Sequence, residues 1–219
     1  GLQAHQAVSA GASEHLAHSS MINFSVEFPP DVLAFYERKK PQIGANAIAD
    51  RVRLRAEMDF KEILPWLPET VRSYINIGCG QGVLDVFMGR HFSPQHVLLI
   101  DGGDAEKEVG FKETITPWTD LTHTKAVLAA NVPDIRYTYN AANEPFDGDT
   151  ELVISLRSWA HHFPVNVYLP SVKIALSGGG VLIVDVRKET DGKSQLEKAF
   201  AFVGIIGGSA KRDRMVFTA

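Results

Sequence analysis

Three glycines, each separated by one residue, stand where an apolar run of the sequence ends. The run "SYINI" spans residues 73–77 and leads into Gly78, Gly80 and Gly82 of "GCGQG". Glycine permits backbone conformations and close approaches that a Cβ atom would block. A strand that enters such a turn and continues into a helix commonly holds a nucleotide-like cofactor. The spacing therefore raises the question of which cofactor this turn would bind.

The position of the third glycine separates two classes of cofactor. Turns that bind dinucleotides follow G-x-G-x-x-G/A, in which the third small residue allows close packing of the helix. Here the third glycine comes one residue early, and Val83 holds the position that should be small. The pattern G-x-G-x-G suits a cofactor without a pyrophosphate, so a nicotinamide dinucleotide is the less favoured alternative.

Two further polar residues follow the next β-rich runs. Asp101 comes directly after "HVLLI" (96–100), where a carboxylate can accept hydrogen bonds from both hydroxyls of a ribose. Asn140 ends the third run, where its amide could bond an adenine edge, and the backbone of Ala141 could add a contact. The alternative is that both side chains only shape turns, in which Asp and Asn are common.

These sites, in this order, resemble those of the class I S-adenosylmethionine-dependent methyltransferases. The stretch "GCGQG" is similar to their glycine-rich first motif, Asp101 to their ribose-binding acid, and Asn140 stands where they usually carry an adenine-contacting acid. The resemblance implies S-adenosyl-L-methionine as cofactor. It also implies a set of cofactor-binding residues, which are Asn76, Gly78, Cys79, Gly80, Gly82, Asp101, Asn140 and Ala141.

Asn76 departs from the pattern of that family, which usually has Asp or Glu at this position. Asn140 is likewise an amide in place of an acid. Because both changes remove negative charge from the cofactor site, the alternative function is a catalytically inactive protein of the same fold, such as a partner subunit. On this interpretation, Asn76→Asp is expected to tighten cofactor binding modestly.

A dense group of polar and aromatic residues follows the fourth β-rich run, "ELVISL" (151–156). Its members are Arg157, Ser158, Trp159, His161 and His162. An imidazole is well matched to removing a proton from a hydroxyl near neutral pH. We therefore predict a histidine as general base, with a slight preference for His162 over His161.

The other members of this group are predicted to hold a methyl acceptor. Arg157 would orient an anionic or hydroxylated acceptor, and Trp159 and Ser158 would contact it, as would Tyr36 from the segment that precedes the sheet. The alternative is that Trp159 belongs to the core and that one histidine is structural. No metal site is predicted, because no His, Cys or Asp spacing stands out.

The stretch "ISLRSWAHHFPVNVYL" is also similar to a segment of proteins classed as bacterial sugar O-methyltransferases. That resemblance implies methyl transfer to a small-molecule hydroxyl, such as that of a sugar or glycoside.

Short β-rich runs alternate with helix-compatible segments from residue 73 onwards. The predicted strands are 73–77, 96–100, 134–139, 151–156 and 180–186, and the predicted helices are 82–91, 118–130, 164–176 and 192–202. This order predicts an α/β fold, a doubly wound, mostly parallel seven-stranded sheet of Rossmann-like type. The last nineteen residues, "AFVGIIGGSAKRDRMVFTA", predict an antiparallel C-terminal hairpin.

We predict three parts along the chain. Residues 1–20, rich in Ala, Ser, Gly, Gln and His, are expected to be a disordered tail or a cloning remnant. Residues 21–70 would form an N-terminal helical cap, and residues 71–219 the S-adenosylmethionine-binding domain. In the cap, apolar residues from Ile48 to Ile63 recur at a 3.6-residue period, which predicts an amphipathic helix.

Three arginines lie between the apolar residues of that helix, at positions 51, 53 and 55. A solvent-facing place is expected for them, with anion binding as the alternative.

Composition limits the classes of partner. The chain has 219 residues, a net charge of −4 and an isoelectric point near 6.1, which argues against a general nucleic-acid binder. No apolar run approaches the ~20 residues of a membrane span. The single cysteine, Cys79, cannot form an internal disulfide, which favours a cytoplasmic setting. We therefore expect a small-molecule partner, and neither nucleic acid nor membrane; the oligomeric state is not indicated.

Overall fold

The computed structural model describes residues 22–102, 107–109, 112–115, 120–142 and 144–219. The expected tail, residues 1–20, lies outside the described residues.

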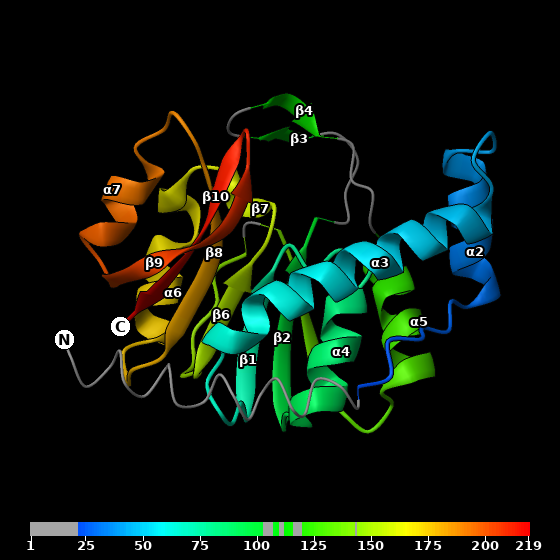
Figure 1. The fold of residues 1–219 in the computed structure, drawn as a ribbon, viewed down its shortest axis with the longest axis horizontal. Coiled ribbons are helices and arrows are strands. Elements are labelled where there is room, and N and C mark those ends of the chain that lie inside the picture. Colours follow the sequence, from blue (N-terminus) through cyan, green and yellow to red (C-terminus); the bar gives the residue numbers. More distant parts are fainter. Residues whose placement is uncertain (1–21, 103–106, 110–111, 116–119, 143) are drawn as a thin grey trace.

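Within those residues, seven strands form one sheet in the order β5-β2-β1-β6-β8-β10-β9 (Figure 1). The strands are β1 (Ser73–Ile77), β2 (His96–Asp101), β5 (Tyr137–Ala141), β6 (Leu152–Ser155), β8 (Val181–Arg187), β9 (Ala201–Ser209) and β10 (Arg212–Thr218). β1 pairs in parallel with both β2 and β6, whereas β10 is antiparallel to both β8 and β9. The predicted sheet and its antiparallel C-terminal hairpin are confirmed.

Helices cover both faces of this sheet because successive side chains of a strand point to opposite faces. In β6, Leu152 and Ile154 join the core beneath α2 (Pro30–Lys39), α3 (Ala45–Ile63), α4 (Val83–Phe92) and α5 (Leu121–Asn131). Val153 joins the other core, with residues of α6 (Leu169–Ala175) and α7 (Gly192–Glu197).

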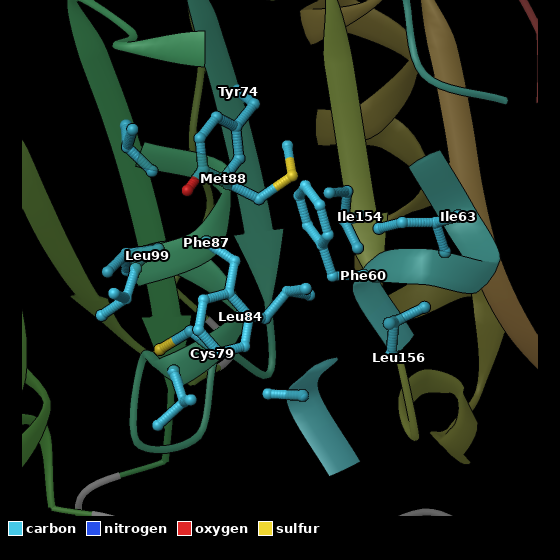
Figure 2. Packing of buried hydrophobic residues seen from close by; sticks show 14 of the residues in the cluster. Phe60, Ile63, Tyr74, Cys79, Leu84, Phe87, Met88, Leu99, Ile154 and Leu156 are labelled. Carbon is cyan, nitrogen blue, oxygen red and sulfur yellow. The ribbon is translucent and has the colours of Figure 1, made fainter. Parts of the chain in front are cut away.

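α3 runs obliquely across the front of the sheet (Figure 1). Its apolar stripe includes Phe60 and Ile63, which are fully buried, and Figure 2 shows both beside Ile154 of β6. Burying each such side chain contributes roughly 1.5–3 kcal/mol. The predicted amphipathic helix is present and ends at Ile63, and the 3₁₀ turn η1 (Leu64–Trp66) follows, with Pro65 within it. The N-terminal helices therefore share a core with the sheet.

The structure of residues 158–163 differs from the sequence prediction. The sequence predicts a loop leading to a helix at residue 164, but these residues form β7 (Ser158–Phe163), and α6 begins only at Leu169, after the 3₁₀ turn η2 (Val165–Val167). Arg157 adopts a left-handed conformation (φ 59°), and the backbone N–H of Trp159 donates to the Ser155 hydroxyl. Such contacts redirect the chain and have no signature in local periodicity.

Two smaller differences concern other segments. A two-stranded sheet, β3 (Lys107–Val109) and β4 (Lys112–Ile115), was not predicted and is drawn at the top of Figure 1. α7 ends at Glu197, before β9, whereas the prediction extended a helix to residue 202. Among the described residues, no helix is both long and apolar enough to span a bilayer.

Candidate active site

The glycine turn lies at the carboxyl end of β1 and is fastened to the neighbouring strand. The backbone N–H groups of Gly78 and Cys79 both donate to the carbonyl of Ile100, at 2.7 and 3.2 Å. Gly78 has φ +83°, and a Cβ atom there would lie 2.1 Å from the Cβ of Ser158. Gly80 has φ +59° and open space where its Cβ would be. The turn thus requires glycine at both positions and leaves Gly80 facing free space.

Asp101 ends β2 beside this turn. Its two carboxylate oxygens accept hydrogen bonds from the backbone N–H groups of Gly80, at 2.6 Å, and Gly102, at 2.7 Å. Burial raises the pKa of Asp101 to about 6, although both hydrogen bonds act to lower it. Each oxygen of an ionised carboxylate has a further lone pair, so Asp101 can still accept bonds from hydroxyl groups.

Asn140 and Ala141 lie next to the end of β2. In the parallel register of β2 and β5, Ile100 is opposite Asn140 and Asp101 is opposite Ala141. The backbone N–H of Ala141 donates to the carboxylate of Glu144, at 3.0 Å. A contact between this N–H and an adenine would have to displace Glu144.

Asn76 has a partner that the sequence reasoning missed. Its side-chain amide donates to both carboxylate oxygens of Asp85 in α4, at 3.0 Å each, and the Tyr74 hydroxyl donates to the same carboxylate at 2.9 Å. All three side chains are buried. The expectation for Asn76→Asp did not include this partner, and the new carboxylate would contact that of Asp85.

Cys79 is buried between two carboxyl groups. Burial, together with Asp101 and Asp85, raises the pKa of its thiol well above the usual range. Because the thiolate is the nucleophilic form, Cys79 is suited to packing in the turn rather than to covalent chemistry.

A cavity of about 560 Å³ opens beside the glycine turn, beneath the N-terminal helices. α2, α3 and the segment between them contribute Tyr36, Lys40, Ile43, Ile48, Arg51, Val52, Arg55, Ala56 and Asp59. The turn and its flanks contribute Asn76, Gly78, Cys79, Gly80, Gln81, Val83 and Leu84, and the chain after β6 contributes Leu156, Arg157 and His162. One space therefore joins the predicted cofactor turn to a predicted base.

The two histidines differ in their access to this cavity. His162 is half-buried and lines it, whereas His161 is buried and does not. Their ring centroids lie 4.6 Å apart. Ala160, directly before His161, adopts a left-handed conformation (φ 62°), so β7 is not a regular strand at this point.

Arg157 lines the cavity, but its charge is already paired. Its guanidinium donates to both carboxylate oxygens of Asp59 in α3. Burial alone would raise the pKa of Asp59, but its bonds with Arg157 and Arg214 hold that pKa below the ordinary value. The prediction that Arg157 orients an acceptor does not agree with this pairing.

Trp159 and Ser158 do not line the cavity in which an acceptor was predicted to bind. Trp159 is fully buried, and its indole N–H donates to the carbonyl of Val165 at 2.9 Å. It belongs to the core, as the alternative interpretation held. Ser158 packs against Gly78, and neither it nor Trp159 lines the cavity.

A buried charge cluster holds α3 against the ends of β8 and β10. Arg214, fully buried, donates to Asp185 at 2.8 Å, and it also bonds Asp59 and Glu62 in α3. Asp185 accepts further bonds from Arg212, at 2.7 Å, and from the backbone N–H of Arg157, at 3.0 Å. The cluster thereby positions the helix that covers the cavity.

The cavity also contains two of the three arginines for which anion binding was the alternative to a solvent-facing place. Arg51 and Arg55 line it, whereas Arg53 is paired with Glu57 at 2.8 Å and does not. Arg51 and Arg55 are four residues apart and therefore share one face of the helix, and this spacing could have distinguished them from Arg53 in the sequence.

Within the described ranges, no group of three or more His, Cys, Asp or Glu side chains is arranged to hold a metal ion.

Several solved structures share this fold. A candidate O-methyltransferase from Nostoc punctiforme PCC 73102 superposes with a TM-score of 0.50 at 15% identity, over 97% of this chain and 69% of that one. The pyocyanin biosynthetic protein PhzM superposes with a TM-score of 0.52 at 13% identity, over 79% of this chain. LaPhzM gives 0.50 at 15% identity, over 83% of this chain. The chain has the Rossmann-like fold of class I methyltransferases.

These similarities concern the fold. The matched regions amount to 58% of the length of PhzM and 60% of that of LaPhzM. No protein-family model matches the sequence, and no curated protein matches it either.

Proposed function

We propose that this chain is an S-adenosylmethionine-dependent methyltransferase that acts on a hydroxyl of a small molecule. The observation that carries the proposal is that the glycine turn and His162 line the same cavity. S-adenosyl-L-methionine would supply a methyl group activated by its positively charged sulfur. The fold shared with a candidate O-methyltransferase supports the same reaction class.

The residues at the turn fit this cofactor. The open space at Gly80 would admit a ligand against the backbone, and Asp101 is held by two N–H groups with acceptor capacity left for ribose hydroxyls. Asn140, beside the end of β2, would face the adenine. Asn76 acts through Asp85, and Gly78, Cys79 and Gly82 shape the turn.

His162 is the proposed general base. A neutral imidazole ring nitrogen would take the proton of the acceptor hydroxyl as the oxygen gains its bond to the methyl carbon, whose bond to the sulfur would break to leave S-adenosylhomocysteine. Among the two predicted histidines, only His162 lines the cavity, which supports the preference for it. The helices α2 and α3 would exclude water from the reacting groups.

The experiment is a binding and turnover assay. S-adenosylhomocysteine is titrated into the protein by calorimetry, and methyl transfer from labelled S-adenosylmethionine is measured with sugars, glycosides and hydroxy acids. The proposal predicts saturable binding and turnover that falls by about 10²–10⁴-fold in His162→Gln. His161→Gln serves as the matched control and should retain most of the turnover.

Two results would count against the proposal. An absence of binding by both cofactor forms at millimolar concentration would exclude it. Binding without turnover on any acceptor would favour the catalytically inactive alternative.

A further inference from the structure

We infer that the cavity beneath α2 and α3 recognises an acceptor that carries a carboxylate, through Tyr36, Arg51 and Arg55. The inference rests on the proposed function, since it names the class of acceptor for the same site.

Tyr36 is the first observation. Its side chain is fully buried and lines the cavity, and its hydroxyl has no hydrogen-bond partner among the described residues. An unsatisfied buried polar group costs about 1–3 kcal/mol, and a ligand that accepts a hydrogen bond from this hydroxyl would remove that cost. Burial raises the pKa of Tyr36 well above its usual range, so the hydroxyl remains a donor.

The charges around the cavity are the second observation. Its described lining contains four basic side chains and one carboxylate, Asp59, which bonds Arg157 and Arg214. In the part of the chain that the structure describes, neither Arg51 nor Arg55 has an acidic partner. Since the whole chain carries a net charge of −4, this excess of positive charge is local.

The arrangement of arginines along α3 supports a binding role. Arg51 and Arg55 are four residues apart and line the same cavity, whereas Arg53 lies between them in sequence and bonds Glu57. A helix places residues i and i+4 on one face, so the two guanidinium groups can act on one anion. Guanidinium is well matched to carboxylate, which it can bind with two parallel hydrogen bonds.

The apolar residues of the lining indicate the chemical character of the uncharged part of the acceptor. Ile43, Ile48, Val52, Leu84 and Leu156 give the cavity an apolar wall. Such a wall favours an aromatic or otherwise apolar hydroxy acid over a sugar, whose many hydroxyls would lose their hydrogen bonds to water.

The anion could belong to the acceptor or to the amino-acid end of the cofactor. The glycine turn leads directly into α4, and the first N–H groups of a helix are themselves donors for a carboxylate. Arg51 and Arg55 come instead from α3. We therefore assign them to the acceptor, and the experiment separates the two sources.

The test is calorimetric titration of the protein saturated with S-adenosylhomocysteine. The probes are 4-hydroxybenzoate and 3-hydroxy-2-naphthoate, each compared with its neutral amide. We expect each acid to bind about tenfold more tightly than its amide, as one charged hydrogen-bonded contact would provide. The double variant Arg51→Gln/Arg55→Gln should abolish that difference and leave S-adenosylhomocysteine binding unchanged. Tyr36→Phe should weaken binding of the acids, and Arg53→Gln should behave as the wild type.

Two results would overturn the inference, and a third would separate it from the proposed function. If neither acid binds more tightly than its amide, the inference is wrong. If the double variant loses affinity for S-adenosylhomocysteine but keeps the acid preference, the arginines serve the cofactor, and the assignment to the acceptor is also wrong. If S-adenosylhomocysteine does not bind the wild type, the proposed function fails, and the same titrations without it still decide whether the cavity prefers acids.

Discussion

Asn76 donates its side-chain amide to both carboxylate oxygens of Asp85, at 3.0 Å each. In the methyltransferases that the glycine turn resembles, the acid usually stands at the strand position. Here the amide is on β1 and the acid is on α4, nine residues later. A carboxyl group is therefore present beside the turn, although not at the expected position.

The first prediction exchanges these two side chains. Above about pH 7, where Asp85 is ionised, Asn76→Asp alone brings two buried carboxylates together and should lower the free energy of unfolding by several kcal/mol, because like charges in a buried site repel. The double variant Asn76→Asp/Asp85→Asn restores one amide and one acid and should recover most of the loss. Urea unfolding of both variants measures the coupling. A double variant no more stable than Asn76→Asp would show that the two positions are not interchangeable.

The second prediction concerns stability and pH. Burial raises the pKa of Asp85 to about 7, from an ordinary value of 3.8. Between these values the folded protein keeps a proton that the unfolded chain has lost, so this contribution to stability is complete below about pH 4 and is lost as the pH rises through about 7. Asp85→Asn should flatten the dependence. Urea unfolding of the wild type and of Asp85→Asn between about pH 4 and about pH 7 checks this prediction. If the free energy of unfolding changes with pH equally in both proteins, Asp85 is not the group responsible.

The third prediction concerns cofactor affinity and pH. Burial raises the pKa of Asp101 to about 6, and only the ionised carboxylate offers every lone pair to ribose hydroxyls. Affinity for S-adenosylhomocysteine should therefore fall as the pH drops from about 7 towards about 5. Asp101→Asn should bind weakly and with little pH dependence. Calorimetry at several pH values measures both, and a flat wild-type profile would argue against the ribose role.

The fourth prediction tests the tightest point of the glycine turn. Gly78→Ala places a Cβ atom 2.1 Å from that of Ser158, in addition to its positive φ of 83°. It should greatly weaken binding of S-adenosylhomocysteine. Gly148→Ala is the matched control, because Gly148 has φ +99° with nothing near its Cβ position. The control should lose only about 1–2 kcal/mol of stability and keep its affinity. If both variants lose the same affinity and stability, the positive φ accounts for the loss and the contact with Ser158 does not.

The fifth prediction concerns the cluster that holds α3. Arg214→Met leaves the buried Asp185 with Arg212 as its remaining cation and removes the cation that Glu62 contacts, and it should cost about 3–5 kcal/mol of stability. The control is Lys188→Met, since Lys188 forms an exposed ion pair with Asp213 at 3.1 Å. That change should cost less than about 1 kcal/mol. Thermal or urea unfolding measures the stability lost in each variant. Similar losses in the two variants would show that burial does not determine how much these ion pairs stabilise the fold.

The sequence alone was sufficient for the order of the strands in the seven-stranded sheet and for the residues at their carboxyl ends, but not for β3, β4 or β7. Apolar runs of strand length, separated by helical segments, predict parallel pairing, and parallel strands bring their carboxyl ends to one edge of the sheet. For this reason Gly80 and Asp101, twenty-one residues apart, could be expected to meet. Local spacing and topology together carry that information.

Only the tertiary structure decided which charged and polar groups pair with one another. Arg157 pairs with Asp59, ninety-eight residues away, and Asn76 pairs with Asp85, and the sequence indicated neither partner. Trp159 lies in the core, and of the three arginines that line the cavity, Arg51 and Arg55 have no carboxylate partner among the described residues. Such pairings depend on distances between side chains in space, which hydrophobic periodicity does not encode.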